Sequence, residues 1–191
     1  MVRQNLARRA ALVDAAIEVL AAEGARGLTF RAVDGQAGVP VGTASNYFAS
    51  RDDLLTQAGG RIYERLMPDE PTMAAASVGP RSTERVVELM RELVARIIAF
   101  RTGWLALLEL RLEAIRRPEL RAVLTERIRQ DIGDNVRYHL ESGLPGDETT
   151  VKLLYLTLNW LIVEQLTLPD LFTEEEVQEL IARAVERSLP V

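Results

Sequence analysis

Apolar and polar residues alternate along most of this chain with a period of three to four positions, the spacing that gives an α-helix one apolar face. Near the N-terminus this pattern predicts a helix over residues 8–23, because Gly24 follows its last apolar position and favours a helix end. Thr29 is placed to begin a second, short helix, and a third is predicted over residues 41–48. No segment shows the sustained two-residue alternation that is typical of a β-strand.

The fourth predicted helix begins beside Ser50, because Asp53 follows three positions later and such a pair is typical of a capping box. It reaches about residue 67, where a stretch rich in proline and glycine, residues 68–80, indicates a connection. Asp147 is a predicted N-cap further along the chain, and Thr173 with Glu176 forms a second predicted capping box; Pro118 fits a first turn. Five further helices are predicted over residues 86–100, 104–112, 118–142, 148–168 and 174–189. The pattern therefore predicts an all-α protein of about nine helices.

The segment between the second and third predicted helices is rich in small residues. Gly38 can adopt a left-handed conformation at a helix end, and Pro40 lies in the turn that follows. Gly42 has no side chain, so the backbone at the start of the next helix can approach DNA closely. Two short helices joined by such a turn, and braced by a first helix, form a helix-turn-helix whose second helix enters the major groove. An ordinary helical hairpin with a glycine turn is the alternative interpretation.

The motif GLTFRAVDGQAGVPVGTASNYFASRDDLL, residues 27–55, resembles the N-terminal pattern of the TetR family of bacterial transcriptional regulators. This resemblance implies a three-helix DNA-binding domain over residues 1–52 and a helical ligand-binding and dimerisation domain over residues 53–191. The helix from about residue 51 to 67 would connect them. It also implies a repressor that leaves its palindromic operator when a small molecule binds; an activator, or an interaction protein that does not bind DNA, on the same scaffold is the alternative.

The resemblance further implies which residues contact double-stranded DNA. Arg51 stands where the family usually has a lysine, and is expected to anchor a phosphate, while Arg3, Arg8 and Arg9 could form an arm along the DNA backbone. The expected DNA contacts are Thr29, Arg31, Val41, Gly42, Thr43, Ser45, Asn46, Tyr47 and Arg51. Four positions differ from the family pattern, so the operator sequence stays open. The family usually has an alanine in place of Asp34, a capping serine in place of Pro40, a tyrosine in place of Ser45 and a histidine in place of Tyr47.

In the C-terminal part the helix over residues 151–168 is apolar nearly all round, so one face can pack on its own domain and another on a second copy. The resemblance implies a homodimer through the last two helices; a central helix within a monomer is the alternative. An apolar or aromatic effector is expected to bind nearby. The candidate pocket residues, each of which could instead be ordinary core, are Met90, Phe100, Trp104, Leu108, Tyr155, Asn159 and Trp160.

Composition narrows the remaining function classes. The 191 residues include no cysteine and one histidine, which argues against disulfides, thiolate or histidine-rich metal sites and cysteine nucleophiles; we expect no metal and no cofactor. An enzyme would have to rely on carboxylates such as Glu109 and Glu113, four positions apart on one predicted helix, and salt bridges explain these more simply. Up to Arg65 eight arginines stand against seven acidic residues, so the acidic excess behind the net charge of −5 lies downstream of the DNA-binding motif.

Membrane insertion is not expected. Residues 151–168 approach the length of a membrane span, but they include Lys152 and Glu164, which would be costly in lipid. The N-terminal segment lacks the unbroken apolar stretch of a signal peptide, because Asp14 and Glu18 interrupt it. We therefore expect a cytoplasmic protein.

Overall fold

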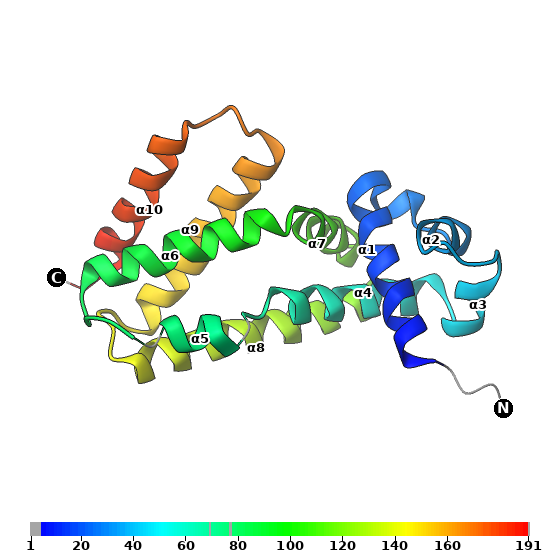
Figure 1. Cartoon of the computed structure of the whole chain (residues 1–191), viewed down its shortest axis with the longest axis horizontal. Helices are drawn as coiled ribbons and strands as arrows, with labels where there is room; N and C mark the ends of the chain where they lie inside the picture. The colour runs from blue at the N-terminus through cyan, green and yellow to red at the C-terminus, as the bar shows by residue number, and fades with distance from the viewer. Residues whose placement is uncertain (1–4, 69, 77, 191) are drawn as a thin grey trace. The chain divides into compact units, whose positions relative to one another are not determined.

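The computed structural model describes residues 5–68, 70–76 and 78–190, and within them it contains helices and no strand (Figure 1). The predicted all-α class is confirmed. The helices are α1 (Leu6–Gly27), α2 (Phe30–Gln36), α3 (Thr43–Tyr47), α4 (Arg51–Leu66), α5 (Glu70–Ala76), α6 (Thr83–Ala99), α7 (Arg101–Ala114), α8 (Pro118–Ser142), α9 (Glu148–Thr167) and α10 (Glu174–Ser188).

The expected number of about nine helices missed α5, which lies in the stretch rich in proline and glycine. Residues 74–76 are all alanine, the strongest helix former, and Pro71 occupies the first turn, where the missing N–H does no harm. Helix propensity therefore outweighs the flanking turn residues here.

Glycine and side-chain caps fix the ends of the N-terminal helices. Gly24 has a φ of 68°, which interrupts the regular part of α1 at the predicted position before one more turn to Gly27. Thr29 Oγ1 accepts a hydrogen bond from Ala32 N at 3.1 Å and begins α2 as predicted. The capping box predicted at α4 is only half formed, because Ser50 Oγ accepts from Asp53 N while the Asp53 carboxylate accepts from the amide of residue 49.

The chain divides into two compact units. The first comprises Met1–Met67 and Phe100–Arg127, and in it α1 packs against α2, α4 and α7. Its core includes the fully buried side chains of Leu12, Ile17, Leu20, Val33, Phe48, Leu54, Leu55 and Ile62. This division differs from the expected boundary between residues 52 and 53, because the packing of α7 on α1 joins α7 to the N-terminal helices.

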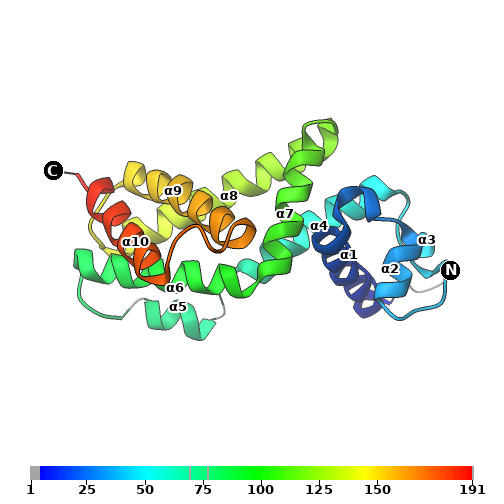
Figure 2. The same ribbon diagram turned by 90° about the horizontal axis from the view of Figure 1, so that it is seen from above.

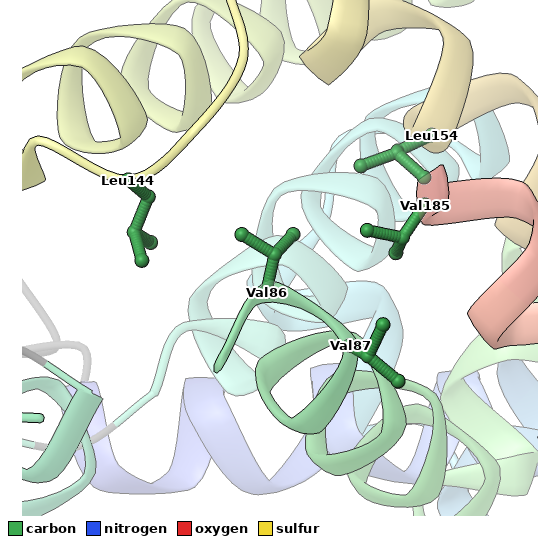
Figure 3. Packing of buried hydrophobic residues seen from close by; sticks show 5 residues of the cluster. All are labelled: Val86, Val87, Leu144, Leu154 and Val185. Atoms are coloured by element: carbon green, nitrogen blue, oxygen red, sulfur yellow. The ribbon is translucent and has the colours of Figure 1, made fainter. Parts of the chain in front are cut away.

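The second unit comprises Pro68–Ala99 and Ile128–Val191. Its helices α6, α9 and α10 pack against one another, and α6 and α9 run in the same direction (Figure 2). Close to the start of α9 the side chains of Val86, Val87, Leu144, Leu154 and Val185 form a buried cluster (Figure 3). Because these residues come from α6, the loop before α9, α9 and α10, the cluster joins all three helices.

Candidate nucleic-acid interface

The turn between α2 and α3 depends on two glycines with positive φ. Gly38 has a φ of 65° and its amide donates to Gly35 O at 3.1 Å, while Gly42 has a φ of 93° immediately before α3. An L side chain would be strained at either position. A Cβ added at either glycine would meet no described atom within 4 Å, so the requirement comes from the backbone conformation and not from crowding.

Asp34 joins α2 to the start of α3. Its side chain is 1% exposed; Oδ2 accepts a hydrogen bond from Gly42 N and Oδ1 accepts one from Ala44 N, each at 2.7 Å. Sequence reasoning noted Asp34 only as a departure from the family pattern. One signal in the sequence could have revealed the role of Asp34: it is an acidic residue next to Val33, on the buried side of a short helix that a turn follows.

The polar side chains of α3 form hydrogen bonds to the backbone of the preceding turn. Thr43 Oγ1 donates to Pro40 O at 2.5 Å, Ser45 Oγ donates to Gly42 O at 2.9 Å, and Asn46 Nδ2 donates to the same oxygen at 2.9 Å. Ser45 and Asn46 are exposed, whereas Thr43 is half-buried. The hydroxyl oxygens of Thr43 and Ser45 keep acceptor capacity for a groove-lining donor.

Several of the expected contact residues lie on the surface around α3, which lies beside α2 at one end of the first unit (Figure 1). Val41 is 76% exposed immediately before Gly42. Arg31 is exposed on α2, and its side chain has no hydrogen bond or ion pair to any residue that the structure describes. Tyr47 is half-buried at the end of α3, and Thr29 is exposed while its hydroxyl caps α2.

Arg51 is the expected contact whose structural role differs most from the expectation. Its Nε donates to Leu28 O at 2.9 Å and its Nη2 donates to Ala25 O, so the guanidinium joins the start of α4 to the end of α1. These bonds occupy two of the three nitrogens that were expected to face a phosphate. A phosphate contact by Arg51 stays a prediction, and it would have to use the remaining N–H groups, two on Nη1 and one on Nη2, or exchange these carbonyls for DNA.

The proposed N-terminal arm is also engaged within the fold. Arg9 Nε donates to Gln57 Oε1 at 2.9 Å, Nη1 donates to Tyr47 O at 2.7 Å, and the guanidinium lies 5.0 Å from the Phe48 ring centroid. Arg9 therefore packs α1 against α3 and α4. Arg8 is exposed, and Arg3 lies outside the described residues.

The two carboxylates considered for catalysis have structural partners. Glu109 Oε2 accepts from Ala25 N at 2.9 Å, which ties α7 to the end of α1. Glu113 binds Arg117 at 2.9 Å, and this hydrogen bond lowers the pKa of the Glu113 carboxyl. Arg117 also pairs with Asp52 in the first turn of α4. These contacts favour the salt-bridge interpretation of both carboxylates.

The seven candidate pocket residues fall in both units. In the first, Phe100 lies under the Arg65 guanidinium at 4.2 Å, Leu108 is half-buried, and Trp104 is 7% exposed with an indole N–H that has no acceptor among the described residues. A pocket that contains all seven stays a prediction.

In the second unit Met90 packs beside the buried cluster, Asn159 Nδ2 donates to Tyr155 O at 2.5 Å on its own helix, and Trp160 is 66% exposed. A shallow hollow of about 610 Å³ lies between Arg91 and the start of α10, and none of the seven residues lines it.

An exposed apolar stripe runs along α9. Leu153, Leu156 and Trp160 are 44%, 65% and 66% exposed, and their spacing of three and four positions places them on one face. Within the described residues no group of three or more histidine, cysteine or acidic side chains could hold a metal ion. None of the described helices is both long and apolar enough to cross a membrane.

Comparisons with known proteins agree with this arrangement. The model of bacterial regulatory proteins of the tetR family matches residues 12–58, and that of the tetracyclin repressor-like C-terminal domain matches residues 81–190. The HTH-type transcriptional regulator BetI of Rhizobium meliloti is 31% identical over 150 residues, 74% of this chain and 68% of that protein.

Solved structures are similar over nearly the whole chain. A putative TetR-family transcriptional regulator from Mesorhizobium loti has a TM-score of 0.76 at 16% identity, with 97% of both chains covered, which shows the fold. The multidrug binding protein EbrR complexed with ethidium has a TM-score of 0.66 at 30% identity, with 96% of this chain and 99% of that chain covered.

Proposed function

Because this chain belongs to the TetR family of bacterial transcriptional regulators, we propose that it is a ligand-responsive dimeric repressor that binds a palindromic operator through α3. The observation that carries the proposal is the surface around α3, where Ser45 and Asn46 are exposed on the helix and Val41 is exposed in the turn before it, while buried hydrogen bonds hold the start of α3. Family members are transcriptional regulators, which are not enzymes.

Arg31 is the cation we assign to the DNA backbone. It is exposed in the first turn of α2 and its side chain has no partner among the described residues, whereas Arg9 and Arg51 are bound within the fold. A side chain that is free to meet a phosphate releases counterions when it binds, so Arg31 should contribute to the salt dependence of affinity. Thr29, Thr43 and Tyr47 are proposed to contribute hydrogen bonds to phosphates or base edges.

Electrophoretic mobility shift of the full chain with the DNA upstream of its own coding sequence tests this surface. We expect Arg31→Ala to weaken binding to all sequences and to reduce the salt slope by about 1, and Tyr47→Ala to weaken binding too. Arg137→Ala, which removes the same charge from an exposed pair with Asp134, is the matched control. Undiminished binding by both test variants would overturn the assignment of this surface.

We further propose that two copies associate through α9 and α10, so that the stripe of Leu153, Leu156 and Trp160 is covered. Two copies related by a two-fold axis place two recognition helices on successive turns of the operator. Sedimentation analysis should find a dimer for the wild-type chain and monomers for Leu156→Glu. Leu140→Glu, at an apolar side chain of α8 that is 52% exposed against 65% for Leu156, should stay dimeric; equal behaviour of the two variants would contradict the interface.

The proposed effector is a small apolar or aromatic molecule. The structure named above contains EbrR with ethidium, and in this chain the indole N–H of the buried Trp104 has no acceptor among the residues that the structure describes. Ethidium and proflavin are suitable probes in a thermal-shift assay followed by DNA release. A ligand that binds the DNA-free form better will raise the melting temperature and release DNA together. Stabilisation without any change in DNA affinity would argue against ligand control.

A further inference from the structure

The recognition helix α3 lacks a cap in its own sequence. It has five residues, too few to be stable alone, and it begins after Gly42, which has no side chain. Pro40, two residues earlier, has neither a hydroxyl nor an N–H group. The first-turn amides of α3 therefore need acceptors from elsewhere in the fold.

Those acceptors come from Asp34 on α2. Both carboxylate oxygens are used, each at 2.7 Å from an amide nitrogen, and Asp34 O also accepts from Val39 N at 3.0 Å within the turn. The side chain is 1% exposed, and no arginine or lysine in the described part of the chain pairs with it. Its charge is balanced instead by the amides and by the positive end of α3.

The two hydrogen bonds to Asp34 determine the orientation of α3 as well as its stability. A carboxylate bound by two amides two residues apart holds α3 at one rotation relative to α2, and that rotation determines where Val41, Ser45 and Asn46 point. We propose that Asp34 is the positioning residue of the recognition helix, and that DNA specificity depends on it although it touches no DNA. The proposal rests on the DNA-binding function proposed above.

Substitutions at Asp34 test whether the orientation of α3 depends on the two hydrogen bonds to this side chain. Asn keeps one acceptor but turns an NH₂ group toward a backbone N–H, and Ala leaves two buried amides unpaired. Both variants should lose about tenfold or more in affinity for DNA selected from a random pool by the wild-type chain, since orphaned buried donors typically cost this much. Binding to non-specific duplex should change much less, because phosphate contacts carry no sequence information.

A second substitution supplies the rescue. A serine at position 40 can accept from the amide two or three residues later, so Pro40→Ser should be nearly neutral in the wild-type chain and should restore part of the specificity of Asp34→Ala. Arg31→Ala is the contrasting control, because it should lower specific and non-specific binding alike. Unchanged specificity in Asp34→Ala and Asp34→Asn, or rescue absent in the Asp34→Ala, Pro40→Ser double variant, would overturn the proposal.

Amide hydrogen exchange of the DNA-free chain, measured by NMR, tests the placement of Asp34 independently. The Gly42 and Ala44 amides should exchange at least tenfold faster in Asp34→Ala than in the wild type, while amides of α10 keep their rates. Equal exchange rates would contradict the cap itself. If the wild-type chain selects no DNA, the proposed function fails while this measurement still decides the role of Asp34 in the fold.

Discussion

The amides in the first turns of α3 and α10 have no acceptor within their own helix, and the two helices differ in where the acceptors come from. At α10, Thr173 Oγ1 accepts from Glu176 N at 3.2 Å and the Glu176 carboxylate accepts from Thr173 N at 2.8 Å. At α3, the acceptor is Asp34, on another helix. A capping box lies within four consecutive residues, whereas the cap of α3 exists only once two helices have packed. The helix that we propose contacts DNA is thus held by its neighbour α2.

The largest effect is expected where a contact between distant segments is removed, as in Arg51→Ala. This variant leaves Leu28 O and Ala25 O without their guanidinium donor, and we expect it to cost about 2 kcal/mol in the unfolding free energy of the first unit. Urea unfolding followed by Trp104 fluorescence, with Trp160 changed to Phe, measures that unit. Arg51→Lys replaces two donor nitrogens held in a planar fork by a single ammonium nitrogen, so its loss of stability should lie between those of the wild type and Arg51→Ala. A loss below about 0.5 kcal/mol in Arg51→Ala would show that these two hydrogen bonds do not stabilise the first unit.

A smaller effect is expected at the locally capped helix. Thr173→Ala should cost about 1 kcal/mol, because it removes the acceptor for Glu176 N at the start of α10. Thr173→Ser keeps the hydroxyl and should be close to the wild type. Urea unfolding monitored by Trp160 fluorescence, with Trp104 changed to Phe, measures the stability of the second unit. Equal unfolding free energies of the Thr173→Ala and Thr173→Ser variants would show that the capping box does not stabilise α10.

The smallest effect is expected at the end of α8, where His139 Nε2 lies 3.0 Å from Pro145 O. Burial lowers the pKa of His139 from its usual 6.5, and the Pro145 carbonyl and Asp147 partly oppose this shift. Because the unfolded chain binds the proton more readily, stability is complete above about pH 6.5 and falls as the pH drops through the lowered pKa.

The His139 prediction is checked by measuring the unfolding of the second unit across this range. The wild-type chain should lose more stability between pH 7 and pH 5 than His139→Gln, whose side chain can still donate to Pro145 O but does not titrate. If the unfolding free energies of the two proteins depended on pH in the same way, His139 would be ruled out as the cause of the stability loss.

Several features that depend on neighbouring residues were predictable from the sequence, although α5 was missed, and those that depend on packing were not. Gly24 and Thr29 were identified correctly because a helix end or start is determined within a few residues. The partners of Arg51 lie more than twenty residues away, so its motif position alone suggested a phosphate. Trp104 and Trp160 look alike in an apolar helix, yet one is 7% and the other 66% exposed, because a helix that is apolar all round does not indicate which side meets its own core.

The position of the cap on α2 also bears on how such a protein can diverge. The acceptors for the Gly42 and Ala44 amides belong to Asp34, so replacing Val41, Ser45 or Asn46 does not remove those acceptors. After gene duplication, one copy could therefore acquire a new target sequence through changes at these three surface positions. Helix α3, which carries Ser45 and Asn46, and the turn that carries Val41 would keep their hydrogen bonds to Asp34, which separates the evolution of recognition from the evolution of the fold.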